Sequence, residues 1–472
     1  MVPKEAITKL LEIFPGGQAT RQPEDLAVYG FDASAMAEER APEIVVFPLT
    51  TEQVSETLKL ANEYLFPVTA RGAGSGAVGA AIPLKGGVAM VLTRMNRILE
   101  IDTQNLTALV EPGLVNGKLQ KEVERLGLFY PPDPASLNFS TLGGNVAMGS
   151  GGPRAVKYGV TRDYVLGLEV VLPDGSVVNT GAQTMKSVVG YDFTRLMVGS
   201  EGTLGVVTKI WLRLLPRPEA VRTALAGFNE VEEAAEAVSA IIRSKIIPCA
   251  LELMDKGSVA AVERLLGAGL PDSALLLVET DGPQSQARLD MERIVEILKS
   301  HGAVFVRSAS EAAEREALWK ARRSLSQAVA KTAPNKINED VTVPRSRIPD
   351  LIRELESLSA ATGLPILSFG HAGDGNMHVN IMTDKSDGEN YSKAQKAVEE
   401  VFRITLSLGG TLSGEHGIGL CKAKYIKSEI GVKGVELIRA VKRLFDPNNI
   451  LNPGKILSEE EWRSNGSADI PG

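Results

Sequence analysis

The sequence predicts an α+β protein in which two larger domains share one chain. Three observations predict this fold class. Strand and helix patterns alternate around glycine-rich turns in residues 42–218, long helical patterns interleave with strands in 219–410, and glycine-rich turns return in 411–472. A helical segment at 1–41 precedes them. With 472 residues, 44% of them hydrophobic, the chain is long enough for two or three cores at roughly 150 residues per domain.

The first elements follow from apolar runs and a helix cap. An amphipathic helix is expected at 4–14 and a buried strand at 43–48. Thr50 begins a helix that should run to Tyr64, because a hydroxyl followed by acidic and amide residues is a capping pattern. A second strand at 66–70 leads into a glycine loop. Further strands are expected at 87–92, 106–110, 166–172, 176–179 and 205–214.

The proline-rich segment 215–219 marks a domain boundary. Beyond it, longer helical patterns predict an α+β cap built on an antiparallel sheet. Helices are expected at 229–243, 284–301 and 309–331 and around 435–444, and strands at 274–279 and 304–306.

Composition excludes several classes of protein. The net charge is −7 and the basic residues are scattered, so the chain has no electrostatic footprint for nucleic acid. It has no uncharged apolar run of about 18 residues, which excludes a transmembrane helix. Cys249 and Cys421 are too few for a disulfide framework and form no CxxC zinc motif. We expect a cytoplasmic protein, with peripheral attachment to a membrane through partner subunits left open.

The glycine loop after the strand at 66–70 contains Gly74-x-Gly76-x-x-Gly79. A nicotinamide site needs a helix directly after such a loop, and Pro83 with the glycine pair at 86–87 prevents one. Successive backbone N–H groups in a glycine turn still bind phosphate. Similar loops recur at 141–145, 149–152 and 199–205. Together the loops predict a large cofactor that carries phosphate.

These segments resemble the FAD-binding domain of the vanillyl-alcohol oxidase (PCMH-type) flavoproteins. The motifs that carry the resemblance lie at 66–76, 131–136, 140–152, 157–159 and 200–206. The resemblance runs from about residue 40 to the end of the chain. It implies a PCMH-type FAD-binding domain at 42–218, an α+β cap for the substrate at 219–410, and a segment at 411–472 that returns to the flavin.

The resemblance also implies which residues hold FAD. The pyrophosphate would lie on Arg71, Gly72, Ala73, Gly74, Ser75 and Gly76. The flavin side would be lined by Asp133, Ser136, Thr141, Gly144, Asn145 and Gly151, and the adenosine side by Glu201, Gly202 and Val206. Further cofactor residues are Pro132, Gly143, Tyr158, Gly205 and Asn452. Covalent members often attach FAD through a histidine in or near the pyrophosphate loop. Since none lies there, we expect the FAD to be non-covalent.

Three of the four histidines fall in two short glycine-rich segments. His371 ends a predicted strand and His378 begins the next, across a Gly-Asp-Gly-Asn hairpin turn, so their rings can converge. Glu415 and His416 lie on a second glycine turn. Two histidines and a carboxylate that leave coordination positions of the ion open are typical of a catalytic metal site. Alternatively, Glu415 could orient a histidine through a hydrogen bond. The fourth, His301, is expected to cap a helix end.

The two segments are similar to the D-2-hydroxyacid dehydrogenase branch, which includes the D-lactate dehydrogenases and the glycolate oxidases. That resemblance assigns His371, His378 and Glu415 to a divalent metal (zinc, manganese or iron) and makes His416 the base. Substrate-binding residues would be Arg322, with Arg323 as a rival, Ser326 and Asn380. Dicarboxylate-specific members carry a lysine near this point. Here Lys336 lies two residues out of register, which argues against 2-hydroxyglutarate.

The function implied is oxidation of a small D-2-hydroxy acid, D-lactate or glycolate, to the 2-oxo acid, with hydride passing to FAD. The metal would polarise the hydroxyl while His416 takes its proton. Two alternatives stay open: a non-catalytic flavin electron-transfer or scaffold subunit, and a zinc-type hydrolase that uses the same ligands. The electron acceptor would be a quinone, an iron–sulfur subunit or an electron-transferring flavoprotein, and the chain could form a homodimer.

Overall fold

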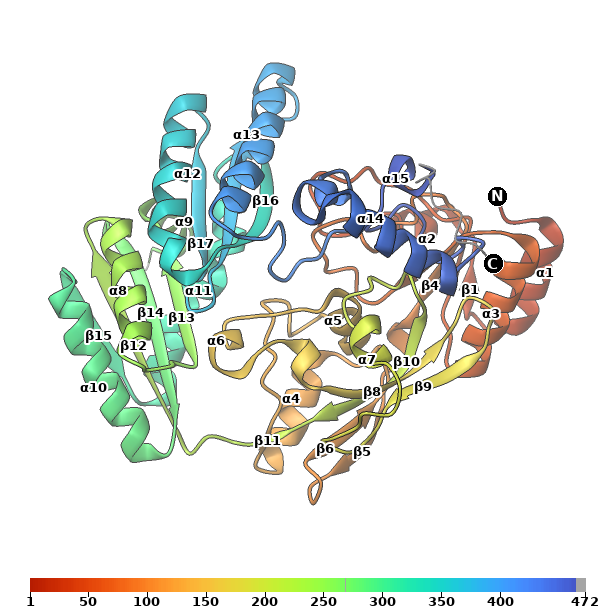
Figure 1. Cartoon of the computed structure of the whole chain (residues 1–472), viewed down its shortest axis with the longest axis horizontal. Helices are drawn as coiled ribbons and strands as arrows, with labels where there is room; N and C mark the ends of the chain where they lie inside the picture. The colour runs from red at the N-terminus through yellow and green to blue at the C-terminus, as the bar shows by residue number, and fades with distance from the viewer. Residues whose placement is uncertain (268, 464–472) are drawn as a thin grey trace.

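The computed structural model describes residues 1–267 and 269–463, which form two bodies side by side (Figure 1). The body on the right of the view holds the N-terminal half and the end of the chain. The chain crosses to the left body after β11 (Leu215–Pro216), at the predicted boundary. It returns after α13 (Gly388–Ser407), so the C-terminal segment belongs to the first body in space.

The right body contains two main sheets. The first has the order β1-β2-β4-β3, with parallel pairing among the last three strands, and the second is antiparallel with the order β5-β6-β10-β8-β9. The strands are β1 (Ala19–Thr20), β2 (Ile44–Val46), β3 (Val68–Arg71), β4 (Val88–Val91), β5 (Ile98–Asp102), β6 (Thr107–Val110), β8 (Val165–Val171), β9 (Val177–Gly181) and β10 (Val206–Arg213), and β7 (Leu128–Phe129) pairs with β11.

Apart from α3, which has 14 residues, the helices in the N-terminal half of this body have ten residues or fewer. They are α1 (Lys4–Ile13), α2 (Pro23–Val28), α3 (Thr51–Tyr64), α4 (Asn116–Arg125), α5 (Leu142–Met148), α6 (Ala155–Tyr158) and α7 (Phe193–Met197). Thr50 caps α3 as predicted, since its side chain accepts a hydrogen bond from the Gln53 amide. Residues 72–87 contain neither helix nor strand, which confirms that the first glycine loop is not a nicotinamide fingerprint.

The left body is one antiparallel sheet of seven strands in the order β15-β12-β14-β13-β17-β18-β16, as predicted for the cap. The strands are β12 (Ala220–Phe228), β13 (Ala250–Met254), β14 (Ala274–Gly282), β15 (Phe305–Ala309), β16 (Asn335–Thr342), β17 (Ile366–His371) and β18 (Asn376–Thr383). The helices are α8 (Val231–Arg243), α9 (Lys256–Leu266), α10 (Gln284–Ser300), α11 (Ala312–Ala330), α12 (Ile348–Thr362) and α13. His301 follows α10, and its Nδ1 contacts the Ile297 carbonyl oxygen at 2.9 Å, as expected for a helix end.

The C-terminal segment packs back onto the first body. Its main helix, α14 (Ile426–Phe445), is longer than predicted and breaks at Gly431, where φ is +70°. Leu451 then forms a parallel bridge with Val68 beside the first sheet, and α15 (Glu459–Arg463) follows. Within the described part of the chain, no helix has the length and apolarity needed to cross a membrane.

Candidate active site

A cavity of about 790 Å³ lies between the two bodies, a volume in the range of cofactor and ligand sites. The predicted cofactor residues that line it are Arg71, Gly72, Ala73, Gly74, Ser75, Gly76, Ser136, Thr141, Gly143, Gly144, Asn145, Glu201, Gly202, Gly205 and Val206. The opposite wall comes from α11, β16 and the C-terminal loop that carries Glu415 and His416. The cavity therefore reaches from the glycine loops to the second histidine segment, whereas His371 and His378 are not among its lining residues.

Two glycines of the first loop, Gly72 and Gly74, are required by close approach. A Cβ on Gly72 would come within 2.3 Å of the Thr141 hydroxyl, and one on Gly74, where φ is +68°, within 2.2 Å of the Arg71 guanidinium. The loop thus presents backbone to the cavity. Arg71 lines the cavity, and its guanidinium lies close to Gly74 of the loop. The guanidinium donates to the Phe31 carbonyl at 2.6 Å and lies over the Tyr29 ring, so it connects the loop to these two residues.

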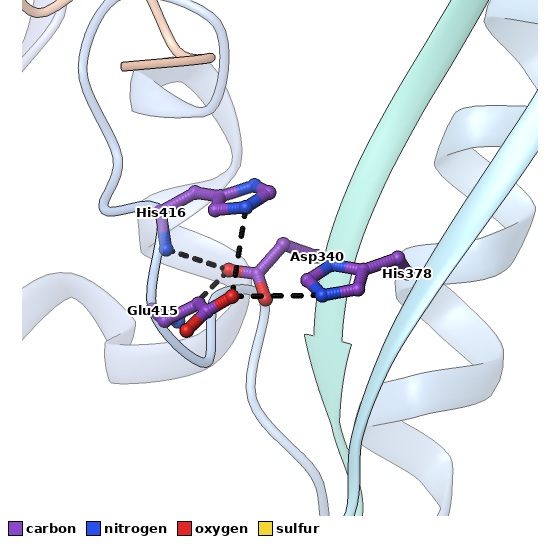
Figure 2. Close-up of side chains that lie close together, drawn as sticks. All are labelled: Asp340, His378, Glu415 and His416. Carbon is purple, nitrogen blue, oxygen red and sulfur yellow. Dashed lines mark hydrogen bonds and ion pairs between the residues drawn. The ribbon is translucent and has the colours of Figure 1, made fainter. Parts of the chain in front are cut away.

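Three histidine rings converge on one carboxylate oxygen. Oε1 of Glu415 lies 3.5 Å from Nε2 of His371, 3.5 Å from Nε2 of His378 and 3.8 Å from Nε2 of His416. The rings of His378 and His416 stack, with centroids 5.2 Å apart. Figure 2 shows the side chains of His378, Glu415 and His416 pointing toward one another from β18 and from the C-terminal loop.

The sheet register explains how His371 is held. Glu252 of β13 stands opposite His371 of β17, and this fully buried carboxylate accepts a hydrogen bond from Nδ1 of His371 at 2.7 Å. Its other oxygen accepts from Nε of Arg322 at 2.5 Å. A carboxylate on Nδ1 leaves Nε2 free to act as a ligand, which is the usual support for a metal-bound histidine. Glu252 therefore links the predicted metal ligand to the predicted substrate arginine.

Asp340 of β16 organises the Glu415–His416 loop. Its Oδ2 accepts hydrogen bonds from the backbone N–H groups of Gly414, Glu415 and His416 at 2.9–3.0 Å and from the Ser413 hydroxyl at 2.8 Å. Burial would raise the pKa of Asp340, but the charges of His416 and Lys422 and the N–H donors hold it well below its usual range. The carboxylate thus anchors the loop.

The donor set at Glu415 fits a divalent metal. Donor atoms of Asp340, His378, Glu415 and His416 lie within 4.8 Å of one another, and His371 reaches the same Glu415 oxygen from the other side. Oδ2 of Asp340 is occupied by the loop donors and its Oδ1 accepts from Nδ2 of Asn376, so the nitrogen donors available beside Glu415 are those of His371, His378 and His416. The metal ligands predicted from sequence, His371, His378 and Glu415, are three members of this group. Oε2 of Glu415 is buried with no hydrogen-bond partner among the described residues. Such an orphaned atom is what a bound ion would satisfy.

The ionisation states suit a metal at two of the three predicted ligands. Burial lowers the pKa of His378 to about 3, so its ring is neutral. Burial opposes ionisation of Glu415, but its contacts with His371 and the other histidines lower its pKa to about 2. Burial would also lower the pKa of His371, but Glu252 and Glu415 raise it well above its usual range, so a metal at this ring would have to displace a proton.

The predicted substrate residues occupy three positions. Arg322 is buried and stacks over the Phe369 ring, and its Nε bond to Glu252 leaves the terminal nitrogens for a bidentate contact. Arg323, which is half exposed, and Ser326 line the cavity, whereas the buried Arg322 and Asn380 are not among its lining residues. Asn380 donates through Nδ2 to two carbonyls, while its buried Oδ1 is without a partner in the described chain.

Lys336 lies in the cavity even though it is out of register with the dicarboxylate-specific pattern. The lysine of the dicarboxylate-specific pattern would stand at the position that Asn338 occupies here. Positions 336 and 338 are two residues apart on β16 and therefore share a face, and both line the cavity. Nζ of Lys336 donates to the Ser326 hydroxyl at 3.2 Å.

Five predicted cofactor residues do not line this cavity: Pro132, Asp133, Gly151, Tyr158 and Asn452. Tyr158 instead joins the two bodies, since its hydroxyl donates to Asp281 of β14 at 2.7 Å. Gly151 faces the histidine–carboxylate cluster, because a Cβ there would come within 3.0 Å of the orphaned oxygen of Glu415. Asn452 donates to the backbone carbonyl of Glu201 at 2.6 Å, and Asp133 accepts from the Arg154 amide.

Two functional side chains were not predicted from sequence. Glu252 is the charged residue in the otherwise apolar strand β13 (Ala-Leu-Glu-Leu-Met), and a buried carboxylate in such a strand is a signal that was available. Asp340 lies 73–76 residues before the loop that it holds. No local pattern links the two.

Asp340→Asn should lower the free energy of unfolding by about 3 kcal/mol, because one member of a buried charged cluster loses its charge. The native carboxylate has a depressed pKa, so its contribution is complete above the unfolded value of about 3.9 and is lost as pH falls below it. In urea unfolding, the free energy of unfolding of the variant should be lower than that of the wild type by a constant amount near neutral pH. This difference should shrink in acid. A difference in the free energy of unfolding that grows in acid would contradict the role of Asp340 in holding the Glu415–His416 loop.

A two-body fold with glycine loops on one side of a cavity and a histidine–carboxylate cluster on the other defines a class of flavin-dependent oxidoreductases. The chain belongs to the family of FAD-linked oxidases. Residues 217–456 match the model of the FAD linked oxidases C-terminal domain, and residues 42–181 match an FAD binding domain. The predicted family, fold class and FAD cofactor are thereby confirmed, and the hydrolase alternative is wrong.

Individual relatives agree with this placement. The chain is 44% identical to the glycolate oxidase subunit GlcD of Bacillus subtilis, over 92% of each chain. It is 37% identical to a D-lactate dehydrogenase of Anaerostipes hadrus, over 92% of this chain and 91% of that one. Among solved structures, p-cresol methylhydroxylase with substrate bound superposes with a TM-score of 0.81 at 20% identity, covering 96% of both chains. That likeness shows the fold.

Proposed function

We propose that the enzyme oxidises a small D-2-hydroxy acid, glycolate or D-lactate, to the 2-oxo acid, assisted by a divalent metal. The observation that carries the proposal is the meeting of His371, His378, Glu415 and His416 at one point beside the cavity of the glycine loops. The names of the relatives support the substrate class, since those proteins are a glycolate oxidase component and a D-lactate dehydrogenase.

The division of labour among the side chains follows from their positions. Arg322, whose terminal nitrogens are not used by Glu252, would bind the substrate carboxylate. Ser326, which lines the cavity, and Asn380 would contact the remaining polar atoms. His371, His378 and Glu415 hold the metal, which supplies Lewis acidity at the substrate hydroxyl when bound. His416 lines the cavity beside these ligands and takes the hydroxyl proton. FAD, held on the loops around Gly72, Thr141 and Gly202, supplies the hydride acceptor.

The direct test is product formation in a single turnover without oxygen. Purified holoenzyme mixed with glycolate or D-lactate should yield one 2-oxo acid per flavin as the flavin is reduced. Enzyme that keeps its FAD but forms no 2-oxo acid from any D-2-hydroxy acid would favour the electron-transfer or scaffold alternative instead.

Arg322→Lys should raise KM about 10–100-fold, because hydrogen bonds to charged groups are worth about 1.5–3 kcal/mol and lysine cannot reproduce the planar fork. Arg323→Lys is the matched control, since it changes the neighbouring arginine of α11 in the same way. Steady-state KM for the acid measures both. A larger rise in KM for Arg323→Lys would assign binding of the substrate carboxylate to Arg323. Equal rises would contradict a specific role of Arg322.

A further inference from the structure

One short segment of the FAD-binding body reaches across to the cap. Residues 151–158 run from a glycine loop into α6, and we call them the bridging segment. Figure 1 shows α6 beside β13, and the two elements are in contact. β13 carries Glu252, which holds both His371 and Arg322. The bridging segment therefore meets the cap at the strand that supports the predicted active site.

The bridging segment also contacts the histidine–carboxylate cluster from two sides. At its start, a Cβ on Gly151 would come within 3.0 Å of Oε2 of Glu415. In α6, the side chain of Val156 lies against the turn between β17 and β18, where a Cβ on Gly373 would come within 2.7 Å of it. Glycine at both positions lets the segment pack directly against the cluster.

Two polar side chains of α6 fix the segment to the cap through one carboxylate. Asp281, near the end of β14, accepts a hydrogen bond from the Tyr158 hydroxyl at 2.7 Å. Its other oxygen contacts Nζ of Lys157, which also donates to the Asp281 backbone carbonyl at 2.9 Å. The Asp281 side chain is only 5% exposed, so little water competes for these charge-assisted bonds. We call Lys157, Tyr158 and Asp281 the clasp.

The clasp joins two bodies whose separation matters for the reaction. Bodies of one chain are expected to move relative to each other unless contacts between them prevent it. The predicted acid-binding residues belong to the cap, and Glu415 is anchored to the cap through Asp340. The loops for FAD belong to the other body. Hydride transfer needs the reacting atoms about 3–3.5 Å apart, and a displacement of about 1 Å can slow a reaction about 10²-fold.

We propose that Asp281, Lys157 and Tyr158 are positioning residues for hydride transfer. The clasp holds the cap at the separation at which the α-hydrogen of the bound acid reaches the flavin. None of the three residues lines the cavity, so they act through the placement of the bridging segment and of β13. The inference rests on the proposed function, to which it adds residues that lie outside the binding site.

A separation of binding from rate tests the proposal. Asp281→Asn should lower the limiting rate of anaerobic flavin reduction by D-lactate or glycolate at least about tenfold, as expected for a displacement of less than about 1 Å. The dissociation constant of the acid, obtained from the same stopped-flow series, should stay within about twofold of wild type. FAD content and metal content should also be unchanged, because each body keeps its own binding residues.

Tyr158→Phe is the milder variant, because it removes one hydroxyl and keeps the ring. It should lower the same limiting rate by a smaller factor, about threefold, since one hydrogen bond is lost and the contact with Lys157 remains. This variant carries the test if Asp281→Asn does not fold. Asp281→Glu, which keeps the charge, should recover part of the rate that Asp281→Asn loses.

Glu169→Gln is the matched control, because Glu169 is also a carboxylate that accepts from a lysine and from hydroxyl groups. Its partners Thr51, Thr208 and Lys209 lie 2.7–2.8 Å away, and all of them belong to the FAD-binding body. Glu169→Gln should lower the thermal stability and leave the limiting rate of flavin reduction unchanged.

The separation of the two bodies can be measured without substrate. Spin labels at Leu126→Cys, directly after α4, and at Leu289→Cys, on α10 of the cap, occupy exposed positions of the two bodies. Pulsed EPR of the oxidised holoenzyme should give a narrow distance distribution when the clasp is native. The distribution should broaden in Asp281→Asn and stay narrow in Glu169→Gln.

Three results would overturn the proposal: a limiting rate in Asp281→Asn within about twofold of wild type, an unchanged distance distribution in that variant, or an equal loss of acid binding or FAD, which would indicate a general structural role. Failure of every D-2-hydroxy acid to reduce the wild-type flavin would instead overturn the proposed function. The distance measurement would then still show whether the clasp fixes the two bodies.

Discussion

His416→Ala is expected to retain FAD and metal while flavin reduction by the substrate slows about 10²–10⁴-fold, the usual contribution of a general base. His416 lies in the cavity with its ring stacked on His378, but the predicted metal ligands do not include it. Its backbone N–H, which alanine keeps, supplies its bond to Asp340, so the loop should hold its shape. Stopped-flow measurement of flavin absorbance gives the rate directly.

His301→Ala is the matched control, because that histidine ends α10 in the cap and does not line the cavity. It should reduce flavin at the wild-type rate. Flavin content and metal content should be equal in wild type and both variants. A His416→Ala enzyme with a rate within threefold of wild type would remove His416 as the base, whatever its effect on stability.

Glu252→Gln is expected to weaken metal binding about 10–100-fold, the usual cost of losing a partner that orients a ligand. The carboxylate is fully buried between Nδ1 of His371 and Nε of Arg322. Glutamine keeps the shape but removes the charge that faces both groups. Its effect should therefore appear in two measurements: metal retained after dialysis against a chelator, and KM for the hydroxy acid, which should rise.

Glu111→Gln provides the comparison, because Glu111 is also a buried carboxylate paired with an arginine, Arg97, but is not among the residues that line the cavity. It should change stability without changing metal content or KM. If Glu252→Gln loses stability yet binds metal and substrate like wild type, Glu252 is only a structural residue.

The parts of the site that could be predicted from sequence are those fixed by local backbone chemistry. The Gly-Asp-Gly-Asn turn set the hairpin of β17 and β18, and so brought His371 and His378 together. The glycine loops were likewise predicted as cofactor loops because their backbone must approach another group closely, as Gly72 does to Thr141.

The parts that could not be predicted depend on contacts between distant segments. Glu252 meets His371 only because β13 pairs with β17, more than a hundred residues later. The contacts of Arg71 with the Phe31 carbonyl and the Tyr29 ring could not be predicted either, because no local pattern gives the position of that segment. Side-chain direction at a site is thus set by tertiary partners even where the backbone is predictable.

The most direct test of the account is flavin reduction by the two enantiomers of lactate, in the absence of oxygen, with native and chelator-dialysed enzyme. The account predicts that D-lactate bleaches the flavin, that L-lactate does not, and that removing the metal slows the bleaching while readdition restores it. Bleaching by L-lactate alone, or bleaching by D-lactate at the same rate without metal, would contradict the account.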